Sequence, residues 1–334
     1  MIRVAINGFG RIGRLAFREM ITSNKFDVVA INDLSTPEEL AYLLKYDTNH
    51  RSFHKNEISF TEDSILIGGV KKIKIYKEQD PESLPWKDLQ VDLVLECTGR
   101  FTKVEDAKKH INAGAKKVLI SAPAKGECKT IVYGVNDNTL DGTEEIVSAA
   151  SCTTNCLAPV LKVLVDNFGV KKGFMTTIHA YTNDQATLDI AHKKGISERR
   201  GRACAANIVP TSTGAAKAID KVIPELKGLL DGVAYRVPVP DGSMIDLCLE
   251  LNTKVTKEMI NDCLKKNESV CLVTTNDPVV STDVLGEKTG ALVDLALTKV
   301  IETPNGDLVK VVAWYDNEMG YTSQMMRTAY SLFK

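Results

Sequence analysis

The sequence contains no long apolar run, no CxxC pair and no cluster of Cys and His residues with the spacing of a zinc site. A membrane-spanning helix needs about 20 consecutive apolar residues, and zinc ligands are paired at short spacings. The N-terminus also lacks the basic stretch and apolar core of a secretory signal. These absences predict a cytoplasmic protein with no membrane contact and no metal.

The sequence also lacks an excess of charge of either sign. The 334 residues carry 42 Lys and Arg against 43 Asp and Glu, a formal net charge of −1. Nothing in this balance attracts nucleic acid, so no obligatory nucleic-acid partner is expected. The eight cysteines are scattered along the chain, and in a reducing compartment most are expected to be small core residues.

Strand-like and helix-like segments alternate through the first half of the chain. Expected strands cover 2–8, 26–33, 91–99, 116–123 and 130–136, and expected helices cover 13–23, 37–47 and 103–114. The strands are nearly continuous runs of Val, Ile and Leu. This alternation predicts a parallel sheet covered on both faces.

The second half has longer strands that alternate apolar and polar residues. We expect strands at 173–182, 229–240, 243–252, 291–302 and 308–316, and helices at 156–169, 256–266 and 321–334. This pattern is typical of an antiparallel or mixed sheet. The fold class expected is α/β, with one domain at residues 1–150 and an α+β domain at 151–316.

Gly8, Gly10 and Gly13 form a G-x-G-x-x-G that follows the first expected strand and opens a helix. Asp33 ends the next strand, about 20 residues further on. This is the context of a dinucleotide-binding Rossmann domain. Asp33 would accept from a ribose 2′-hydroxyl and repel a 2′-phosphate, which favours NAD over NADP. The alternative for the three glycines is an ordinary structural turn, and the alternative for Asp33 is a solvated acid at the end of a strand.

The stretch SAASCTTNCLAP, residues 148–159, places Cys152 and Cys156 four residues apart. A metal site, a disulfide, a buried helix start and a nucleophile are the four alternatives. Metal spacing is absent, and side chains one helical turn apart are poorly placed for a disulfide. Cys156 is therefore expected in the core, whereas Cys152 would lie in the first turn of a helix.

A helix N-terminus favours a thiolate and lowers the thiol pKa. Ser151 is expected to cap this helix, and Thr153 and Thr154 would add donors for an anion. Of the five histidines, only His179 ends an apolar strand, where it could serve as the base of Cys152. A thiolate with NAD indicates aldehyde oxidation through a hemithioacetal and a thioester, which a second nucleophile releases.

Basic and hydroxyl side chains gather in expected loops of the second half, at 180–184, at 197–218 and at Arg236. The TSTG segment at 211–214 looks like an anion-binding helix start. These arginines could instead be merely solvated, or the RRGR run could bind nucleic acid weakly. Beside a thiolate and NAD, two phosphate sites are favoured, one for a phosphorylated aldehyde and one for inorganic phosphate.

Six segments carry a resemblance to a known family: INGFGRIGR, LLKYDT, SAASCTTNCLAP, TTIHAYTNDQ, NIVPTSTGAAKA and AWYDNEMGYTSQ. The chain resembles phosphorylating glyceraldehyde-3-phosphate dehydrogenases from residue 2 to about residue 330. The resemblance implies NAD-dependent oxidation of glyceraldehyde 3-phosphate with inorganic phosphate. It also implies a homotetramer, a terminal helix from about 317 to 334 that packs on the first domain, and a loop near residues 181–205 close to a neighbouring subunit's cofactor.

The resemblance also implies roles for individual residues. Cys152 would be the nucleophile and His179 the base. Thr182 and Arg236 would hold the substrate phosphate, and the inorganic phosphate would be lined by Ser151, Thr153, Arg200, Thr213 and Gly214. The cofactor would be held by Gly8, Gly10, Arg11, Ile12, Gly13, Asp33, Gln79, Thr98, Gly99, Ser121, Asn317 and Tyr321.

Three residues depart from the family pattern. Gln79 stands where an Arg near the adenine is usual, Ala191 replaces a Pro associated with NAD preference, and Met319 replaces a Trp beside Asn317. Two alternatives remain for the function. One is an erythrose-4-phosphate dehydrogenase, or an acyl-phosphate reductase, on the same scaffold. The other is a binding protein for a nucleotide or RNA.

Overall fold

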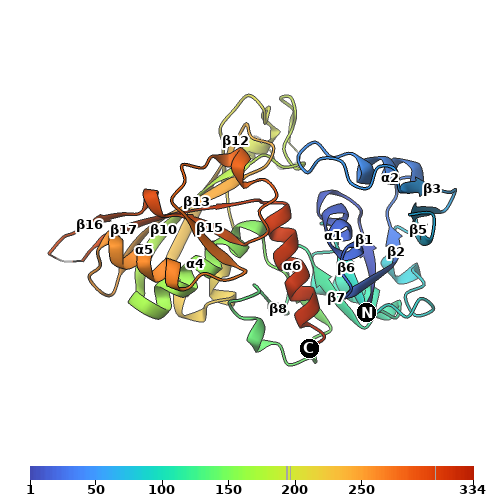
Figure 1. Ribbon diagram of the computed structural model, residues 1–334, viewed down its shortest axis with the longest axis horizontal. Coiled ribbons are helices and arrows are strands. Elements are labelled where there is room, and N and C mark those ends of the chain that lie inside the picture. The colour runs from blue at the N-terminus through green and yellow to red at the C-terminus, as the bar shows by residue number, and fades with distance from the viewer. Residues whose placement is uncertain (193–194, 196, 305) are drawn as a thin grey trace. The chain divides into compact units, whose positions relative to one another are not determined.

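The computed structural model describes residues 1–192, 195, 197–304 and 306–334 and divides the chain into two compact units (Figure 1). Unit 1 comprises Met1–Ile131, Asp137–Ser151 and Met325–Lys334, and unit 2 comprises Val132–Asn136 and Cys152–Gln324. Each unit has its own sheet and its own core.

Unit 1 is built on a nine-stranded sheet in the order β3-β4-β5-β2-β1-β6-β7-β9-β8. The strands are β1 (Ile2–Asn7), β2 (Phe26–Asn32), β3 (Ile58–Phe60), β4 (Ser64–Ile67), β5 (Lys71–Tyr76), β6 (Leu93–Glu96), β7 (Lys117–Ile120), β8 (Lys129–Thr130) and β9 (Ile146–Ser148). The helices are α1 (Arg11–Ile21), α2 (Pro37–Lys45) and α3 (Val104–Asn112). The α/β class is confirmed.

The sheet of unit 1 is parallel except at one edge. The pairs β3–β4 and β4–β5 are antiparallel, so the prediction of an entirely parallel sheet is wrong there. The expected strand at 130–136 is also wrong beyond Thr130, where β8 ends. After it the chain turns, since Val132 N–H donates to Asn136 Oδ1 and Val135 N–H to the Val132 carbonyl.

The central strands of unit 1 end together. In the parallel pairing, Asn7 of β1 lies opposite Asn32 of β2 and opposite Glu96 of β6. Parallel strands in register direct paired side chains to the same face. The loops that follow these three residues therefore leave from one edge of the sheet, the carboxyl edge, where open α/β sheets bind ligands.

Unit 2 is built on an eight-stranded mixed sheet in the order β11-β12-β10-β13-β17-β15-β14, with β16 on β17. The strands are β10 (Val170–Ala180), β11 (Val209–Ser212), β12 (Leu230–Val237), β13 (Ser243–Leu251), β14 (Leu272–Thr275), β15 (Ala291–Asp294), β16 (Lys299–Ile301) and β17 (Leu308–Tyr315). Its helices are α4 (Cys152–Phe168) and α5 (Lys257–Lys266). The start of α6 (Met319–Ser331) also belongs to unit 2.

The strand expected at 291–302 is broken in two. After β15, the carboxylate of Asp294 accepts the Ala296 N–H at 3.2 Å and caps a short 3₁₀ turn, Leu295–Leu297. The chain resumes pairing only at β16. The apolar residues of this segment predict one strand, but the hydrogen bond from the Ala296 N–H to the Asp294 side chain competes with strand pairing and interrupts it.

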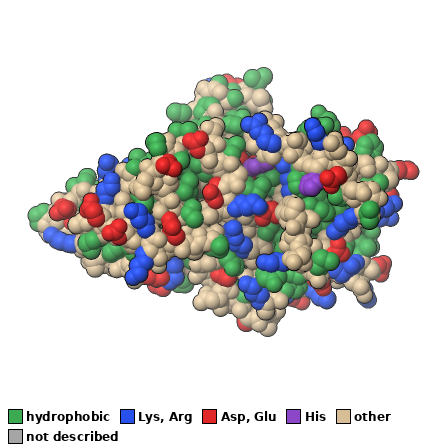
Figure 2. Space-filling model, in the orientation of Figure 1, with side chains coloured by type: hydrophobic (Ala, Val, Ile, Leu, Met, Phe, Trp, Pro, Cys, Tyr) green, Lys and Arg blue, Asp and Glu red, His purple; other side chains and the backbone are tan. Residues whose placement is uncertain are grey.

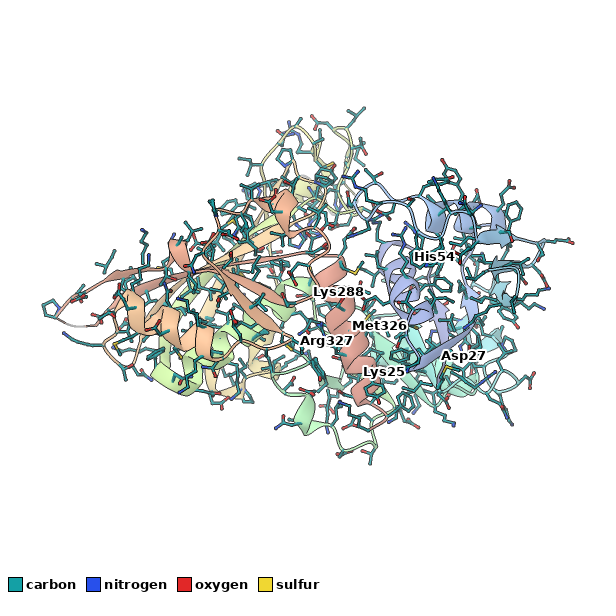
Figure 3. All side chains as sticks on the ribbon, in the orientation of Figure 1. Lys25, Asp27, His54, Lys288, Met326 and Arg327 are labelled. Carbon is teal, nitrogen blue, oxygen red and sulfur yellow. The ribbon has the colours of Figure 1, made fainter. Side chains whose placement is uncertain are left out.

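Helix α6 ends among residues of unit 1. There the Tyr330 ring lies 6.4 Å from the Phe26 ring, and Lys25 Nζ lies 4.3 Å from its centroid. Figure 3 labels Lys25 at the start of β2 and Met326 on α6. Met326 is 5% exposed and belongs to the buried part of unit 1.

Charges of both signs are mixed over the molecular face in Figure 2, where Lys and Arg alternate with Asp and Glu. This distribution agrees with the near-zero net charge of the sequence. Within the described ranges, the structure contains no helix that is both long and apolar enough to cross a bilayer.

The glycines that follow β1 allow a stability test. A Cβ at Gly13 would lie 2.2 Å from the Gly8 carbonyl oxygen, whereas one at Gly10 meets nothing within 4 Å. We predict that Gly13→Ala lowers the free energy of unfolding by about 1–3 kcal/mol, as overpacking does elsewhere. Gly10→Ala is the control and leaves it unchanged. Urea denaturation without ligands measures both, and equal midpoints would contradict the predicted contact.

Candidate active site

A pocket of about 350 Å³ lies at the carboxyl edge of the unit 1 sheet. It is lined by Asn7, Gly8, Gly10, Asn32, Asp33, Leu34, Glu78, Gln79, Cys97, Thr98, Arg100 and Phe101. The members come from the ends of β1, β2 and β6 and from the loop after β5. Of the predicted cofactor residues in unit 1, this lining includes Gly8, Gly10, Asp33, Gln79 and Thr98.

The glycine-rich turn is shaped for a close approach of backbone and ligand. Gly8 has φ +91°, and a Cβ there would lie 2.7 Å from Thr98 N. Helix α1 begins after Gly10 without a side-chain cap, although a helix start normally attracts one. A pyrophosphate suits such a helix start because backbone N–H groups and the helix dipole both favour an anion. The turn therefore fits a dinucleotide.

Asp33 is fixed at the pocket wall by two backbone donors. Its Oδ2 accepts from Phe9 N–H at 2.8 Å and its Oδ1 from Ser35 N–H at 2.9 Å. Each carboxylate oxygen keeps a second lone pair that a ribose hydroxyl can use. The acid thus holds the glycine turn and presents an acceptor to the pocket.

Five predicted cofactor residues of unit 1 lie outside the pocket lining: Arg11, Ile12, Gly13, Gly99 and Ser121. The Arg11 guanidinium pairs with the Asp47 carboxylate, so only its backbone could serve the expected role. Burial raises the pKa of Asp47, but the hydrogen bonds from Arg11 and from the His50 backbone outweigh it and lower that pKa to about 2. The roles of these five residues stay predictions.

Cys152 and His179 face one another in unit 2. Cys152 is the first residue of α4 and is partly exposed, and its Sγ lies 3.4 Å from His179 Nε2. His179 stands near the end of β10 and is 3% exposed. The predicted nucleophile and base are therefore within hydrogen-bond reach.

The register of β10 and β12 places Arg236 beside His179. These strands pair in parallel, with His179 opposite Arg236, so both side chains leave the same face. His179 Nδ1 lies 2.7 Å from the Ala180 carbonyl oxygen and 2.8 Å from Arg236 Nη1. A carbonyl only accepts and a guanidinium only donates, so Nδ1 can satisfy one of these partners at a time.

This choice decides what His179 can do. When Nδ1–H donates to Ala180, Nε2 presents a lone pair to the Cys152 thiol and can act as a base. When Nδ1 accepts from Arg236, Nε2 carries the hydrogen. Burial, Arg236 and Arg200 lower the pKa of His179 to about 3, against the raising effect of the Ala180 bond, so the ring is neutral near pH 7.

The thiol pKa departs from expectation. Burial raises the pKa of Cys152, while Arg236 and a hydrogen bond with Thr153 only partly oppose it. The prediction of a lowered pKa is therefore wrong for the unliganded chain, because loss of hydration outweighs the helix start. Burial also raises the pKa of Cys97 to about 12, and Cys156 is fully buried, so neither competes as a nucleophile.

Tyr315 ties the thiol helix to the histidine strand. Its hydroxyl lies 3.0 Å from Thr153 Oγ1 and 2.8 Å from Thr177 Oγ1. The Tyr315 ring also lies edge-on to His179 with centroids 5.9 Å apart. Sequence reasoning missed both Tyr315 and Thr177. Thr177 precedes His179 by two positions on the same strand face, a signal that period-2 reasoning could have found.

Two arginines, a threonine and an aspartate lie beside this pair. Arg236 Nη1 donates to Thr182 Oγ1 at 3.2 Å, and the Asp184 carboxylate accepts from both Thr182 and Arg200. Arg236 Nε is buried and has no hydrogen-bond partner within the described part of the chain. An unsatisfied buried donor is costly, so an acceptor from a ligand would stabilise it. Sequence reasoning also missed Asp184. Its carboxylate accepts the hydrogen bonds from Thr182 and Arg200 that an external anion could accept instead.

The TSTG segment differs from the expected anion site. No α-helix follows Gly214; the chain forms a 3₁₀ helix of five residues, Lys217–Lys221. The Thr213 hydroxyl accepts the Ala215 N–H at 3.2 Å, and Gly214 opens onto free space. The prediction of a helix start is therefore wrong, and any anion contact here would rest on local backbone and hydroxyl groups. Ser151 directly precedes α4, and its capping role stays a prediction.

Asn317 is held by a short chain of hydrogen bonds. Ala180 N–H donates to Ser243 Oγ at 3.0 Å, and Ser243 Oγ donates to Asn317 Oδ1 at 2.6 Å. Because Oδ1 is engaged, the Asn317 amide group is oriented with its N–H₂ as the remaining donor. Ser243, a third residue that sequence reasoning missed, thus links the histidine strand to Asn317.

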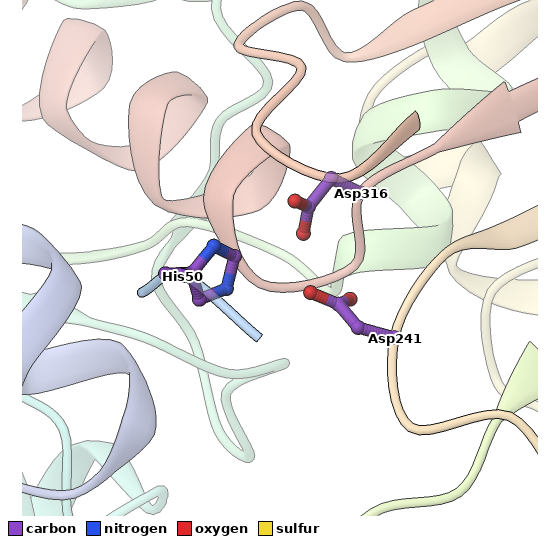
Figure 4. Close-up of side chains that lie close together, drawn as sticks. All are labelled: His50, Asp241 and Asp316. Carbon is purple, nitrogen blue, oxygen red and sulfur yellow. The ribbon is translucent and has the colours of Figure 1, made fainter. Parts of the chain in front are cut away.

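Asp316 starts helix α6 beside this asparagine. Its carboxylate accepts the N–H groups of Glu318 and Met319 at 2.8 and 2.7 Å, and that of Gly286 at 2.7 Å. Figure 4 shows Asp316 at the start of this helix with Asp241 beside it. The cap fixes where Met319 and Tyr321 begin the helix, and Tyr321 is 5% exposed.

These features define a class. A dinucleotide pocket in one unit, with a thiol–imidazole pair and clustered arginines in the other, characterises an NAD-dependent dehydrogenase that works through a cysteine. Two family models agree with this class. The "glyceraldehyde 3-phosphate dehydrogenase, NAD binding domain" matches residues 2–104, and the corresponding "C-terminal domain" matches residues 151–317. The chain belongs to the glyceraldehyde-3-phosphate dehydrogenase family.

Curated relatives of this name are similar over nearly the full chain. The glyceraldehyde-3-phosphate dehydrogenases of Clostridium acetobutylicum and Clostridium pasteurianum are each 56% identical over 328 residues, covering 98% of this chain and 97% of theirs. That of Streptococcus pyogenes is 52% identical over 329 residues, with the same coverage.

Thiol labelling tests the pair. We predict that iodoacetamide at pH 8 labels Cys152 in preference to Cys97 and Cys156, and that His179→Asn slows this labelling by about tenfold or more, since the base is lost. Peptide mass spectrometry over time measures the rates. His54→Asn is the control, because His54 is exposed and contacts Glu57 (Figure 3). Equal rates in wild type and His179→Asn would contradict the pairing.

Proposed function

We propose that this protein oxidises D-glyceraldehyde 3-phosphate with NAD and inorganic phosphate, forming 1,3-bisphosphoglycerate and NADH in glycolysis and gluconeogenesis. The observation that carries the proposal is the 3.4 Å contact of Cys152 Sγ with His179 Nε2, beside an arginine with an unsatisfied buried N–H. Membership in the family supports the same reaction.

The chain's own residues account for the proton movements. Cys152 Sγ adds to the aldehyde carbon while its proton passes to His179 Nε2 and from there to the aldehyde oxygen, which gives a hemithioacetal and leaves Nε2 free again. The bound cofactor supplies the hydride acceptor. His179 takes the hemithioacetal hydroxyl proton as the hydride leaves, so a thioester forms on Cys152. Inorganic phosphate then attacks the thioester carbon, the carbon–sulfur bond breaks, and His179 returns its proton to Cys152 Sγ, which releases the acyl phosphate and regenerates the thiol.

The substrate phosphate is assigned to Arg236 and Thr182. An anion that engages Arg236 would draw its N–H from His179 Nδ1 and leave the Ala180 carbonyl as the only partner there. Nε2 then presents its lone pair to the thiol. Substrate binding and base formation are coupled in this way through one nitrogen atom.

Inorganic phosphate is assigned to Arg200 with Ser151, Thr153, Thr213 and Gly214. Burial and then the charge of Arg236 lower the pKa of Arg200, and both arginines help to lower the pKa of His179. A bound anion would relieve this repulsion. The Asp184 carboxylate must give up Arg200 and Thr182 when phosphate enters. The Thr153 hydroxyl is engaged with Tyr315, so its part in this site stays a prediction.

The cofactor is assigned to the unit 1 pocket, with Asp33 on the adenosine ribose and Gln79 at the adenine. Asn317 would hold the nicotinamide carboxamide through its oriented amide, with Tyr321 nearby. The roles of Gly99, Ser121 and the backbone of Arg11 and Ile12 are proposed on resemblance. Asp33 favours NAD over NADP, because a 2′-phosphate would meet a carboxylate.

A homotetramer in the cytoplasm belongs to the same proposal. Phe174, Tyr235 and Leu308 share one face of the unit 2 sheet by register and are 69%, 38% and 43% exposed. The same face also carries the charged residues Asp231, Glu250 and Lys310. Large exposed apolar side chains on a sheet commonly mark a protein interface. A second copy of the chain is the partner that the family resemblance implies.

Rapid-mixing kinetics test the reaction. With NAD and aldehyde but no phosphate, we predict a burst of NADH approaching one equivalent per active site, because hydride transfer precedes release of the thioester. Adding phosphate then starts steady turnover. Cys152→Ser, with NAD binding intact, gives no burst. A full-rate reaction in that variant, or turnover of erythrose 4-phosphate as fast as of the triose, would contradict the proposal.

Multi-angle light scattering tests the assembly. We predict that wild type has the mass of four chains and that Phe174→Asp shifts it to smaller species, since a charge would be buried in an apolar interface. Val70→Asp is the matched control, because Val70 is 92% exposed and lies in unit 1. A monomeric wild type, or an unchanged mass in Phe174→Asp, would contradict this interface.

A further inference from the structure

A buried polar network lies directly under the dinucleotide pocket. Asn32, Asn7 and Glu96 stand side by side as the last residues of β2, β1 and β6, and they are 5%, 1% and 1% exposed. Asn32 Nδ2 donates to Asn7 Oδ1 at 2.7 Å, and Asn7 Nδ2 donates to Glu96 Oε2 at 2.5 Å. The row crosses three strands without a break.

His110 and Trp86 continue the row into the core. Trp86 Nε1 donates to His110 Nδ1 at 3.0 Å, and His110 Nε2 lies 3.2 Å from Glu96 Oε2. Both side chains are fully buried. An indole N–H can only donate, so His110 Nδ1 must present its lone pair and the ring hydrogen must sit on Nε2. Trp86 thereby fixes His110 as a donor to Glu96.

Glu96 accepts four hydrogen bonds. Oε2 accepts from Asn7 and His110, while Oε1 accepts the Thr98 N–H at 2.8 Å and the Thr98 hydroxyl. Four donors use the full acceptor capacity of a carboxylate, and no donor is needed from it. A glutamine here would turn its N–H₂ either toward the Asn7 amide N–H₂ and the His110 N–H or toward the Thr98 N–H, and each of these groups only donates.

The network holds both walls of the pocket. At one end Glu96 fixes Thr98, whose backbone N would lie 2.7 Å from a Cβ at Gly8 in the glycine turn. At the other end Asn32 pairs with the backbone of Glu78, accepting its N–H at 2.9 Å and donating to its carbonyl at 2.9 Å. Glu78 and Gln79 line the pocket opposite Thr98.

We propose that Glu96, oriented by His110 and Trp86, is the positioning residue of the cofactor pocket. Through Thr98 on one side, and through Asn7 and Asn32 on the other, it sets the separation of the walls that receive the adenosine half of the dinucleotide. Glu96 does not line the pocket and acts only through these neighbours. The inference rests on the proposed dinucleotide function of the pocket.

A rigid network affects binding more than chemistry. When the walls are held before the ligand arrives, less conformational entropy is lost on binding. Loosening them weakens affinity for every ligand that contains the adenosine half, while the thiol chemistry of unit 2 proceeds normally once the cofactor is bound. Affinity and turnover therefore separate in a variant of Glu96.

The experiment compares wild type with Glu96→Gln and Trp86→Phe by titration calorimetry. NAD and ADP-ribose are the probes. Glu96→Gln keeps the shape of the side chain, and we expect its Kd for both probes to rise about tenfold or more, as for a buried group left unpaired. Trp86→Phe keeps the ring against His110 but removes its donor, so a smaller rise in the same direction is expected.

Two further measurements separate positioning from general damage. At saturating NAD, kcat of Glu96→Gln should stay within about twofold of wild type. Hydrogen exchange should quicken in segments 77–80 and 97–100 and stay unchanged in β10. Glu82→Gln is the matched control, because Glu82 is exposed, its carboxylate accepts a hydrogen bond from Asn112, and the substitution makes the same charge change.

The outcomes divide cleanly. Wild-type Kd values in both Glu96→Gln and Trp86→Phe would overturn the inference and leave the proposed function intact. A wild-type chain that binds neither probe would overturn the proposed function and this inference with it. If Glu96→Gln does not fold, Trp86→Phe decides: weaker binding with unchanged kcat supports positioning, and unchanged binding overturns it.

Discussion

In-register pairing of parallel strands is the constraint on which both sites depend. In unit 1 it aligns Asn7, Asn32 and Glu96 at one edge, and in unit 2 it sets His179 opposite Arg236. Side chains alternate along a strand, so a slip of one residue would set Tyr235 or Val237 opposite His179 and turn Arg236 to the other face. The geometry of both sites therefore depends on strand register.

The parts of this fold that could be predicted from the sequence are those that depend on residues adjacent in the chain. The glycine turn after β1, the acid after β2 and the helix that begins at Cys152 each depend on a few adjacent residues, and family membership is confirmed by the relatives. The antiparallel edge β3–β5 was not predicted, because short polar-flanked strands leave little periodic signal. The Asp294 cap that breaks the last expected strand was hidden within an apolar run.

Contacts between distant residues could not be read from the chain. His110 follows two lysines in the sequence, a neighbourhood typical of an exposed helix face, yet it is fully buried between Trp86 and Glu96. The sign of the Cys152 pKa shift was misjudged for the same reason, since helix position is local whereas burial is a property of the whole unit. The ion pair of Asp184 with Arg200 joins residues 16 positions apart in a loop, and nothing in the local sequence indicates it.

The Tyr315 hydroxyl acts as a spacer between two elements that are far apart in sequence. By joining Thr153 to Thr177, it fixes the gap between thiol and imidazole with atoms that take no part in the chemistry. The reactive pair is thus assembled before any substrate arrives. A small electrophile without a phosphate group meets the same spacing of thiol and imidazole but not the anion that draws Arg236 from His179 Nδ1, so it modifies Cys152 without the coupling that the phosphorylated substrate provides.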